Sequence, residues 1–141
     1  MTSFTLDDFL PYQLAVLASR VSRDFARHYG EAFDITIPEW RVVAHLSQSE
    51  RVSVREIHLR VDMDKSKVSR AASKLEASGY ISKRINPVDR RLVELELTEK
   101  GRAMMEAIQP IAHRFEDGVL AGLPKAEAEA FRKTLAKLLA K

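Results

Sequence analysis

The N-terminal part of the chain repeats apolar residues at the spacing of a helix. Asp7 and Asp8, followed by Pro11, mark its start, because acids cap the free N–H groups of a first turn and proline fits inside that turn. The pattern ends near Tyr29, so we expect one long amphipathic helix. Its apolar stripe consists of Leu10, Leu14, Leu17, Val21 and Phe25.

Two shorter stripes follow, and each is introduced by a capping box, in which a hydroxyl residue precedes a glutamate by three positions. Thr36 and Glu39 form the first box, and Ser53 and Glu56 form the second. These boxes predict two short helices. The first has Trp40, Val43 and Leu46 on its apolar face, and the second has Val54, Ile57 and Val61.

A further stripe predicts a helix over residues 65–78. Asp64 can cap its start, and Gly79 suits the position that follows its last residue. A tight turn over residues 61–64 separates it from the preceding short helix. Its apolar face consists of Val68, Ala71, Ala72 and Leu75, and the opposite face of Ser66, Ser69, Arg70, Ser73 and Lys74.

Strand-like alternation then replaces the helical pattern. It covers residues 81–85 and 92–97, with turn-forming and basic residues between them. This predicts a hairpin, to which a short strand near residues 51–52 would add. The expected fold class is therefore mainly α with a small β-hairpin wing (α+β).

Two more helices are predicted after the hairpin. Thr98 caps a long one, which Pro110 should kink because proline removes a backbone donor and crowds the preceding turn. Pro124 opens the last one. Its apolar residues, expected to face inward, are Phe131, Leu135 and Leu138.

Positive charge is concentrated in the helix predicted over residues 65–78 and in the hairpin that follows it. Between residues 65 and 91, eight Lys or Arg accompany two acids, which gives this stretch a charge of +6 in a chain of net charge +3. A basic block on an acidic body is typical of a surface that binds a polyanion. A solvated, lysine-rich helix and hairpin would show the same charge, so the local architecture has to decide.

That architecture is typical of a winged helix-turn-helix. Its first helix would cover residues 54–60 and its second residues 65–78, which would enter the major groove while the hairpin reaches the neighbouring minor groove. We expect Arg91 to enter the minor groove and Asp89 to form an ion pair within the wing. Base contacts are expected from Ser66, Ser69, Arg70 and Ser73. Phosphate contacts are expected from Lys65, Lys74, Lys83, Arg84 and Arg90, with Ser53 and Arg55 beside them.

One continuous segment carries a resemblance to a known family. Asp89-Arg90-Arg91-Leu92-Val93-Glu94-Leu95-Glu96-Leu97-Thr98-Glu99-Lys100-Gly101 resembles the Asp-x-Arg wing signature of the MarR family of bacterial regulators, with its Leu-x-Leu-Thr-x-x-Gly continuation. Residues 37–43 and 68–81 are similar to other recurrent segments of the family. Asp62 stands where the family often has glycine, but aspartate tolerates a left-handed backbone. Without cysteine, the chain falls outside the thiol-oxidation branch of the family.

The resemblance implies a homodimer whose first and last helices interleave, over residues 8–30 and 102–140, around a winged core at about 36–98. The apolar stripes at both ends agree, because so small a core cannot cover them; the alternative is a monomer that packs the two helices on each other. The resemblance also implies a repressor of transcription, bound to a pseudo-palindromic operator in double-stranded DNA. A small aromatic or anionic ligand would release it. Residues expected near that ligand are Arg20, Arg23, His28, Trp40, Arg41 and His45.

Other classes of function find little support in the residues. The chain has no cysteine, so disulfides and thiolate metal sites are excluded, and its four histidines lie on four predicted helices without metal-ligand spacing. We find no catalytic constellation and expect neither an enzyme nor a cofactor. The longest uncharged run, Phe9–Ser19, is too short to cross a bilayer, and residues 1–8 carry acids unlike a signal peptide, so we expect a cytoplasmic protein. A winged helix used only for protein–protein contact is the alternative.

Overall fold

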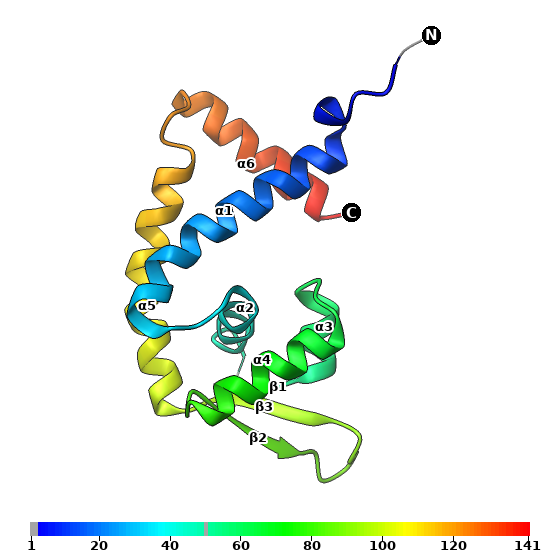
Figure 1. Cartoon of the computed structure of the whole chain (residues 1–141), viewed down its shortest axis with the longest axis vertical. Coiled ribbons are helices and arrows are strands. Elements are labelled where there is room, and N and C mark those ends of the chain that lie inside the picture. Colours follow the sequence, from blue (N-terminus) through cyan, green and yellow to red (C-terminus); the bar gives the residue numbers. More distant parts are fainter. Residues whose placement is uncertain (1–2, 50) are drawn as a thin grey trace.

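The computed structural model describes residues 3–49 and 51–141, so Met1 and Thr2 of the acidic 1–8 segment lie outside the described residues. The order of elements is the predicted one, with the additional short strand (Figure 1). The helices are η1 (Leu6–Asp8, a 3-10 turn), α1 (Leu10–Phe33), α2 (Ile37–Leu46), α3 (Val54–Arg60), α4 (Lys65–Ala77), α5 (Glu99–Val119) and α6 (Lys125–Leu139). The strands are β1 (Val52–Ser53), β2 (Ile81–Ile85) and β3 (Val93–Leu97).

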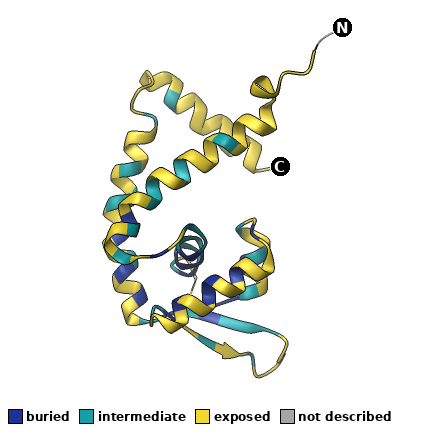
Figure 2. Ribbon diagram, in the orientation of Figure 1, coloured by how far each residue is buried: buried dark blue, intermediate teal, exposed yellow. Residues whose placement is uncertain are grey.

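The winged core, by which we mean residues 36–98, is built on a three-stranded antiparallel sheet with the order β1-β3-β2. Leu95 of the central strand is paired with Val52 on one side and Lys83 on the other. Its side chain is completely buried, because α2, α3 and α4 cover the apolar side of this small sheet (Figures 1 and 2). The α4 residues of the predicted apolar face, Val68, Ala71, Ala72 and Leu75, are all buried there.

Side-chain caps start four of the helices, as predicted from the sequence. The side-chain oxygens of Thr36, Ser53, Asp64 and Thr98 each accept a hydrogen bond from the backbone N–H three residues further on. Gly101, at the end of the Leu-x-Leu-Thr-x-x-Gly segment, packs so closely on the Tyr80 carbonyl that a Cβ atom would clash with it. The first turn of α5 is therefore fixed both by its cap and by a close backbone contact.

The start and end of the first helix differ from the prediction. Helix α1 begins at Leu10 behind Phe9, with no side-chain cap, and Asp7 and Asp8 lie in the separate turn η1. Helix α1 also extends beyond Tyr29 to Phe33, where Asp34 ends it in a left-handed conformation with φ of 52°. The sequence pattern missed this last turn because it contains a single large apolar residue, Phe33, which packs against the buried core.

A helical arm, consisting of α1, the C-terminal half of α5 and α6, projects from the winged core (Figure 1). Helix α5 continues through Pro110 and joins the two parts. The expectation that Phe131, Leu135 and Leu138 face inward is wrong for the single chain, where they are 42%, 40% and 53% exposed. The first half of α1 and nearly all of α6 are exposed as well (Figure 2). The outer part of the arm, formed by the first half of α1 and by α6, therefore keeps its apolar residues on its surface.

Candidate nucleic-acid interface

The turn between α3 and α4 is held by three specific contacts. Asp62 adopts a left-handed conformation with φ of 52°, as its sequence position predicts. The His58 Nδ1 donates to the Met63 carbonyl oxygen over 2.6 Å. Asp64 accepts the Ser66 hydroxyl at 2.7 Å and the Lys67 N–H at 2.8 Å, and these two bonds hold the pKa of the Asp64 carboxyl below its usual value. The first turn of α4 is thus anchored beside the polar face that it presents.

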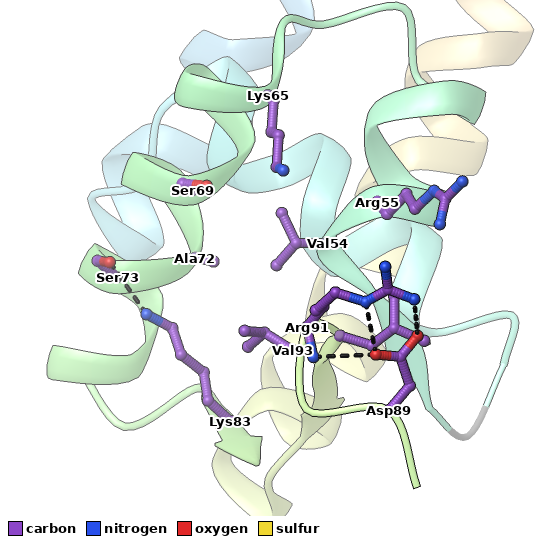
Figure 3. A pocket seen from close by; sticks show the side chains of 11 residues that line it. Val54, Arg55, Lys65, Ser69, Ala72, Ser73, Lys83, Asp89, Arg91 and Val93 are labelled. Carbon is purple, nitrogen blue, oxygen red and sulfur yellow. Dashed lines mark hydrogen bonds and ion pairs between the residues drawn. The ribbon is translucent and has the colours of Figure 1, made fainter. Parts of the chain in front are cut away.

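The wing tip is closed by two short side chains. The Asn86 Oδ1 accepts from the backbone N–H groups of Val88 and Asp89, at 2.8 and 2.9 Å. Asp89 accepts from the Arg91 side chain twice, at 3.0 Å from Nε and 3.2 Å from Nη2, and this pairing lowers the pKa of Asp89 (Figure 3). The predicted ion pair of Asp89 within the wing is confirmed. The Arg91 side chain nevertheless remains 90% exposed.

A cleft of about 420 Å³ lies between α4, the start of α3 and the wing. In Figure 3, Lys65, Ser69 and Ser73 line it from α4, while Arg55 and Arg91 lie on its other side, and the Arg91 guanidinium is turned toward Asp89. Its floor is apolar and its rim is polar and basic. Seven residues singled out in the sequence line it: Arg55, Lys65, Ser69, Ser73, Lys83, Asp89 and Arg91.

Besides Arg91, the cations predicted to contact DNA fall into two groups. Five of them are exposed and, within the described part of the chain, have no acidic group within 4 Å: Arg55, Lys65, Arg70, Arg84 and Arg90. Two lysines are tied to other elements instead. The Lys74 Nζ lies 3.8 Å from Glu39 Oε2, and the Lys83 Nζ donates to the Ser73 hydroxyl at 3.0 Å and lies 3.6 Å from Glu76.

Ser53 is a correction to the predicted set of DNA contacts. It is only 6% exposed, and its hydroxyl oxygen accepts the Glu56 N–H at 3.1 Å as the cap of α3. The capping box, which the sequence also predicted, holds this hydroxyl inside the protein, where a DNA phosphate does not reach it. Its neighbour Arg55 is exposed and lines the cleft.

The six residues expected near a ligand do not share one cavity. His28 lines a cavity of about 700 Å³ between α1 and α5, which the other five do not line. Trp40 stacks on Tyr29, with ring centroids 5.5 Å apart. The His45 Nε2 accepts a hydrogen bond from the Arg60 guanidinium at 3.4 Å. Burial is the main cause that lowers the pKa of His45, and the positive charge of Arg60 adds to it. Arg20 and Arg23 are exposed on α1, and Arg41 is half-buried on α2.

An aromatic cluster under α1 was not identified from the sequence. Phe25 contacts Tyr29, Trp40 and Phe115, with ring centroids 5.0 to 5.2 Å apart. Burial raises the pKa of Tyr29 to about 12, and its hydroxyl has no hydrogen-bond partner among the described residues. The spacing of Phe25 and Tyr29 on one helix face was a signal, but Trp40 and Phe115 come from other elements. Their meeting depends on the tertiary fold.

Two further searches cover residues 3–49 and 51–141. Within them, no three His, Cys, Asp or Glu side chains come together in the manner of a metal site. None of the helices described there combines the length and apolar character needed to cross a bilayer.

A capped recognition helix, a preceding helix joined by a tight turn, and a basic wing beside them define a winged helix-turn-helix. The model of the MarR family matches residues 33–92. The transcriptional regulator BilQ of Clostridium symbiosum is 30% identical over 96 residues, which cover 68% of this chain and 67% of BilQ. The chain belongs to the MarR family of transcriptional regulators, whose members are not enzymes.

Two other similar proteins extend the comparison. The regulator TtmR of Methylorubrum extorquens is 28% identical over 130 residues, which span 92% of this chain but only 64% of the length of TtmR. The structure of BpsR of Bordetella bronchiseptica, described with regulation of its DNA binding by 6-hydroxynicotinic acid, has a TM-score of 0.84 at 22% identity and covers 99% of both chains. At that identity, the likeness to BpsR concerns the fold.

Proposed function

We propose that this protein represses transcription by binding an operator in double-stranded DNA, with α4 in the major groove and the wing in the adjacent minor groove. The observation that carries this proposal is the cleft where the polar face of α4 and the wing converge. Arg55 and Lys65, which are exposed and without acidic partners among the described residues, line it, and Arg70 of α4 is likewise exposed and unpaired there. Unpaired cations on one surface are available to phosphates and bases without first breaking an internal ion pair.

Each group of residues takes a separate role in this complex. Ser69 and Arg70, on the exposed face of α4, contact base edges, with Ser66 and Ser73 beside them. Arg91 enters the minor groove, oriented by Asp89. Phosphate contacts fall to the exposed cations Arg55, Lys65, Arg84 and Arg90.

The active species is a homodimer in the cytoplasm. The helical arm supports this, because the apolar residues of α1 and α6 are exposed in the single chain and form a surface that a second copy can cover. Residues 8–30 and 102–140 are the dimerisation segments, and residues 36–98 read the DNA. A two-fold dimer requires two half-sites about one helical turn apart.

A small aromatic or anionic ligand releases the repressor from its operator. The control of BpsR by 6-hydroxynicotinic acid, within the same fold, supports this part of the proposal. In this chain the site lies between the arm and the winged core, near the aromatic cluster and His28. Isothermal titration with aromatic carboxylates, followed by DNA-binding assays, tests it.

The DNA-binding proposal is tested by selecting duplexes from a random-sequence pool with the wild-type protein. Enrichment of a sequence with two related half-sites is expected. Arg70→Ala should then weaken binding to the enriched duplex by about 1–3 kcal/mol and flatten its preference over random duplex, whereas Lys65→Ala should weaken both alike. Failure of the wild type to enrich any sequence would favour a protein-interaction module and overturn the proposal.

A further inference from the structure

Glu39 is a carboxylate buried beneath the recognition helix. It lies in the first turn of α2, and the residue is 4% exposed. The Thr36 hydroxyl donates to its Oε2 over 2.6 Å, which satisfies one lone pair of the carboxylate. A buried carboxylate is costly unless a cation compensates it. Within the described part of the chain, the cation found within 4 Å of Glu39 is Lys74 of α4.

Lys74 meets this carboxylate from the recognition helix. Its Nζ lies 3.8 Å from Glu39 Oε2, while its side chain is 57% exposed, so the lysine crosses from the surface of α4 toward α2. Arg70 lies one turn earlier on the same face of α4, because residues four positions apart on a helix are neighbours. Because both residues lie on one helix, a rotation or shift of α4 that moves the Lys74 ammonium relative to α2 also changes the direction in which Arg70 points.

The apolar packing between α2 and α4 leaves the relative position of the two helices to be fixed by a more specific contact. The buried face of α4 combines Val68 and Leu75 with the short side chains of Ala71 and Ala72. Burial of apolar side chains is favourable but non-directional, so it does not by itself single out one rotation or sliding position of a helix. A charge pair at a fixed place defines one register, and this is the use of buried polar groups with the best support.

We propose that the Glu39–Lys74 pair sets the register of α4 on α2, so that Lys74 is a positioning residue of the recognition helix and not a phosphate contact. This inference rests on the proposed function, because it assigns the lysine a role in directing Arg70 to the DNA. It replaces the phosphate contact expected of Lys74 from the sequence.

The two roles of Lys74 differ in the sign of one measurement. Glu39→Gln removes a negative charge from the DNA-binding domain, so electrostatics alone would tighten DNA binding. Loss of register instead weakens it. We expect Glu39→Gln to lower affinity for the duplex enriched by the wild type by about tenfold, the order of one good specific contact, with affinity for random duplex unchanged or slightly increased. Glu96→Gln, which neutralises an acid of β3 paired with Arg51, is the matched control and should not weaken binding.

Lys74 variants complete the experiment. Lys74→Met should lose the same tenfold with an unchanged salt dependence, Lys74→Arg should bind as the wild type, and Glu39→Gln combined with Lys74→Met should be no worse than either single change. Loss of a lysine that does bind phosphate lowers the salt slope by about 0.9. Lys65→Met represents that case, because Lys65 has no acidic partner among the described residues. The inference is overturned if Lys74→Met lowers that slope and weakens both duplexes equally, or if Glu39→Gln binds unchanged or more tightly.

Folding and function are kept apart in this test. The melting transition of every variant is monitored by circular dichroism, and DNA binding is measured below it. Lys74→Arg and Glu39→Gln preserve the size of the side chain, whereas Lys74→Met leaves the Glu39 carboxylate unpaired. If the wild type enriches no duplex, the proposed function fails first. If the wild type enriches one and Glu39→Gln binds it normally, only the role of the pair is refuted.

Discussion

The winged core and the helical arm differ in how completely they bury their apolar residues. In the core, Leu75 and Leu95 are at most 1% exposed, whereas in the arm Leu14, Leu17 and Leu138 are 47%, 49% and 53% exposed. Both regions have helices of similar amphipathic pattern. The core closes on itself through three helices and a sheet, while the arm offers its apolar face outward. An amphipathic stripe thus predicts that a face will be covered, but not by which chain.

The largest expected effect comes from charging the arm. Leu135→Asp should convert the proposed dimer into a monomer and weaken operator binding by at least about 100-fold, because two half-sites no longer bind as one unit. Sedimentation and DNA titration measure both effects. Leu59→Asp, at a residue 72% exposed on α3, is the matched control and should leave the oligomeric state unchanged. A Leu135→Asp protein that remains dimeric would show that the arm is not the interface.

A smaller effect is expected at the wing, on the DNA-binding side of the comparison. Arg91→Ala should weaken operator binding and lower the salt slope by about 0.9, while the free energy of unfolding barely changes, because the side chain is 90% exposed. Titration at several salt concentrations and thermal melting measure the two. Arg91→Lys should restore the slope but only part of the affinity, because it loses the planar guanidinium. Equal slopes for wild type and Arg91→Ala would leave Arg91 as a surface partner of Asp89 alone.

The turn between α3 and α4 gives a smaller expected effect, a change of about 1 kcal/mol in the free energy of unfolding. His58→Leu removes the donor that bonds the Met63 carbonyl at 2.6 Å and should destabilise the domain by that amount. His58→Asn places an amide N–H close to the position of Nδ1 and should recover most of the loss. Chemical denaturation measures both variants. If asparagine and leucine destabilise equally, the bond to Met63 does not hold the turn.

The smallest expected effect is a pH dependence. Burial and Arg60 lower the pKa of His45, so the folded state favours its neutral form. The contribution of His45 to stability is therefore fully present above its unfolded pKa, near 6.5, and declines as the pH falls through the window down to the lowered folded pKa. Denaturation at pH 7.5 and 5.5 should show less loss of stability for His45→Gln than for the wild type. An identical loss in both proteins would contradict this.

Much of the core was predictable because its signals are local. Thr36, Ser53, Asp64 and Thr98 cap helices through contacts three residues away, and Asp62 adopts its left-handed conformation within a single turn. The hairpin register follows from strand alternation and a short turn. The site was predicted as a surface: the exposed face of α4 and the wing do line one cleft.

The sequence by itself determined the order of elements, the helix caps, the basic surface and the family, because each depends on residues close together in the chain. Only the tertiary structure decided which cations are available. Lys65 and Lys74 look equivalent in the sequence, but the first is unpaired among the described residues and the second lies beside a glutamate 35 positions earlier in the chain. The same holds for Ser53, whose burial depends on β3, and for the cluster around Phe25. Pairing and burial depend on which distant elements meet, and local spacing does not encode that.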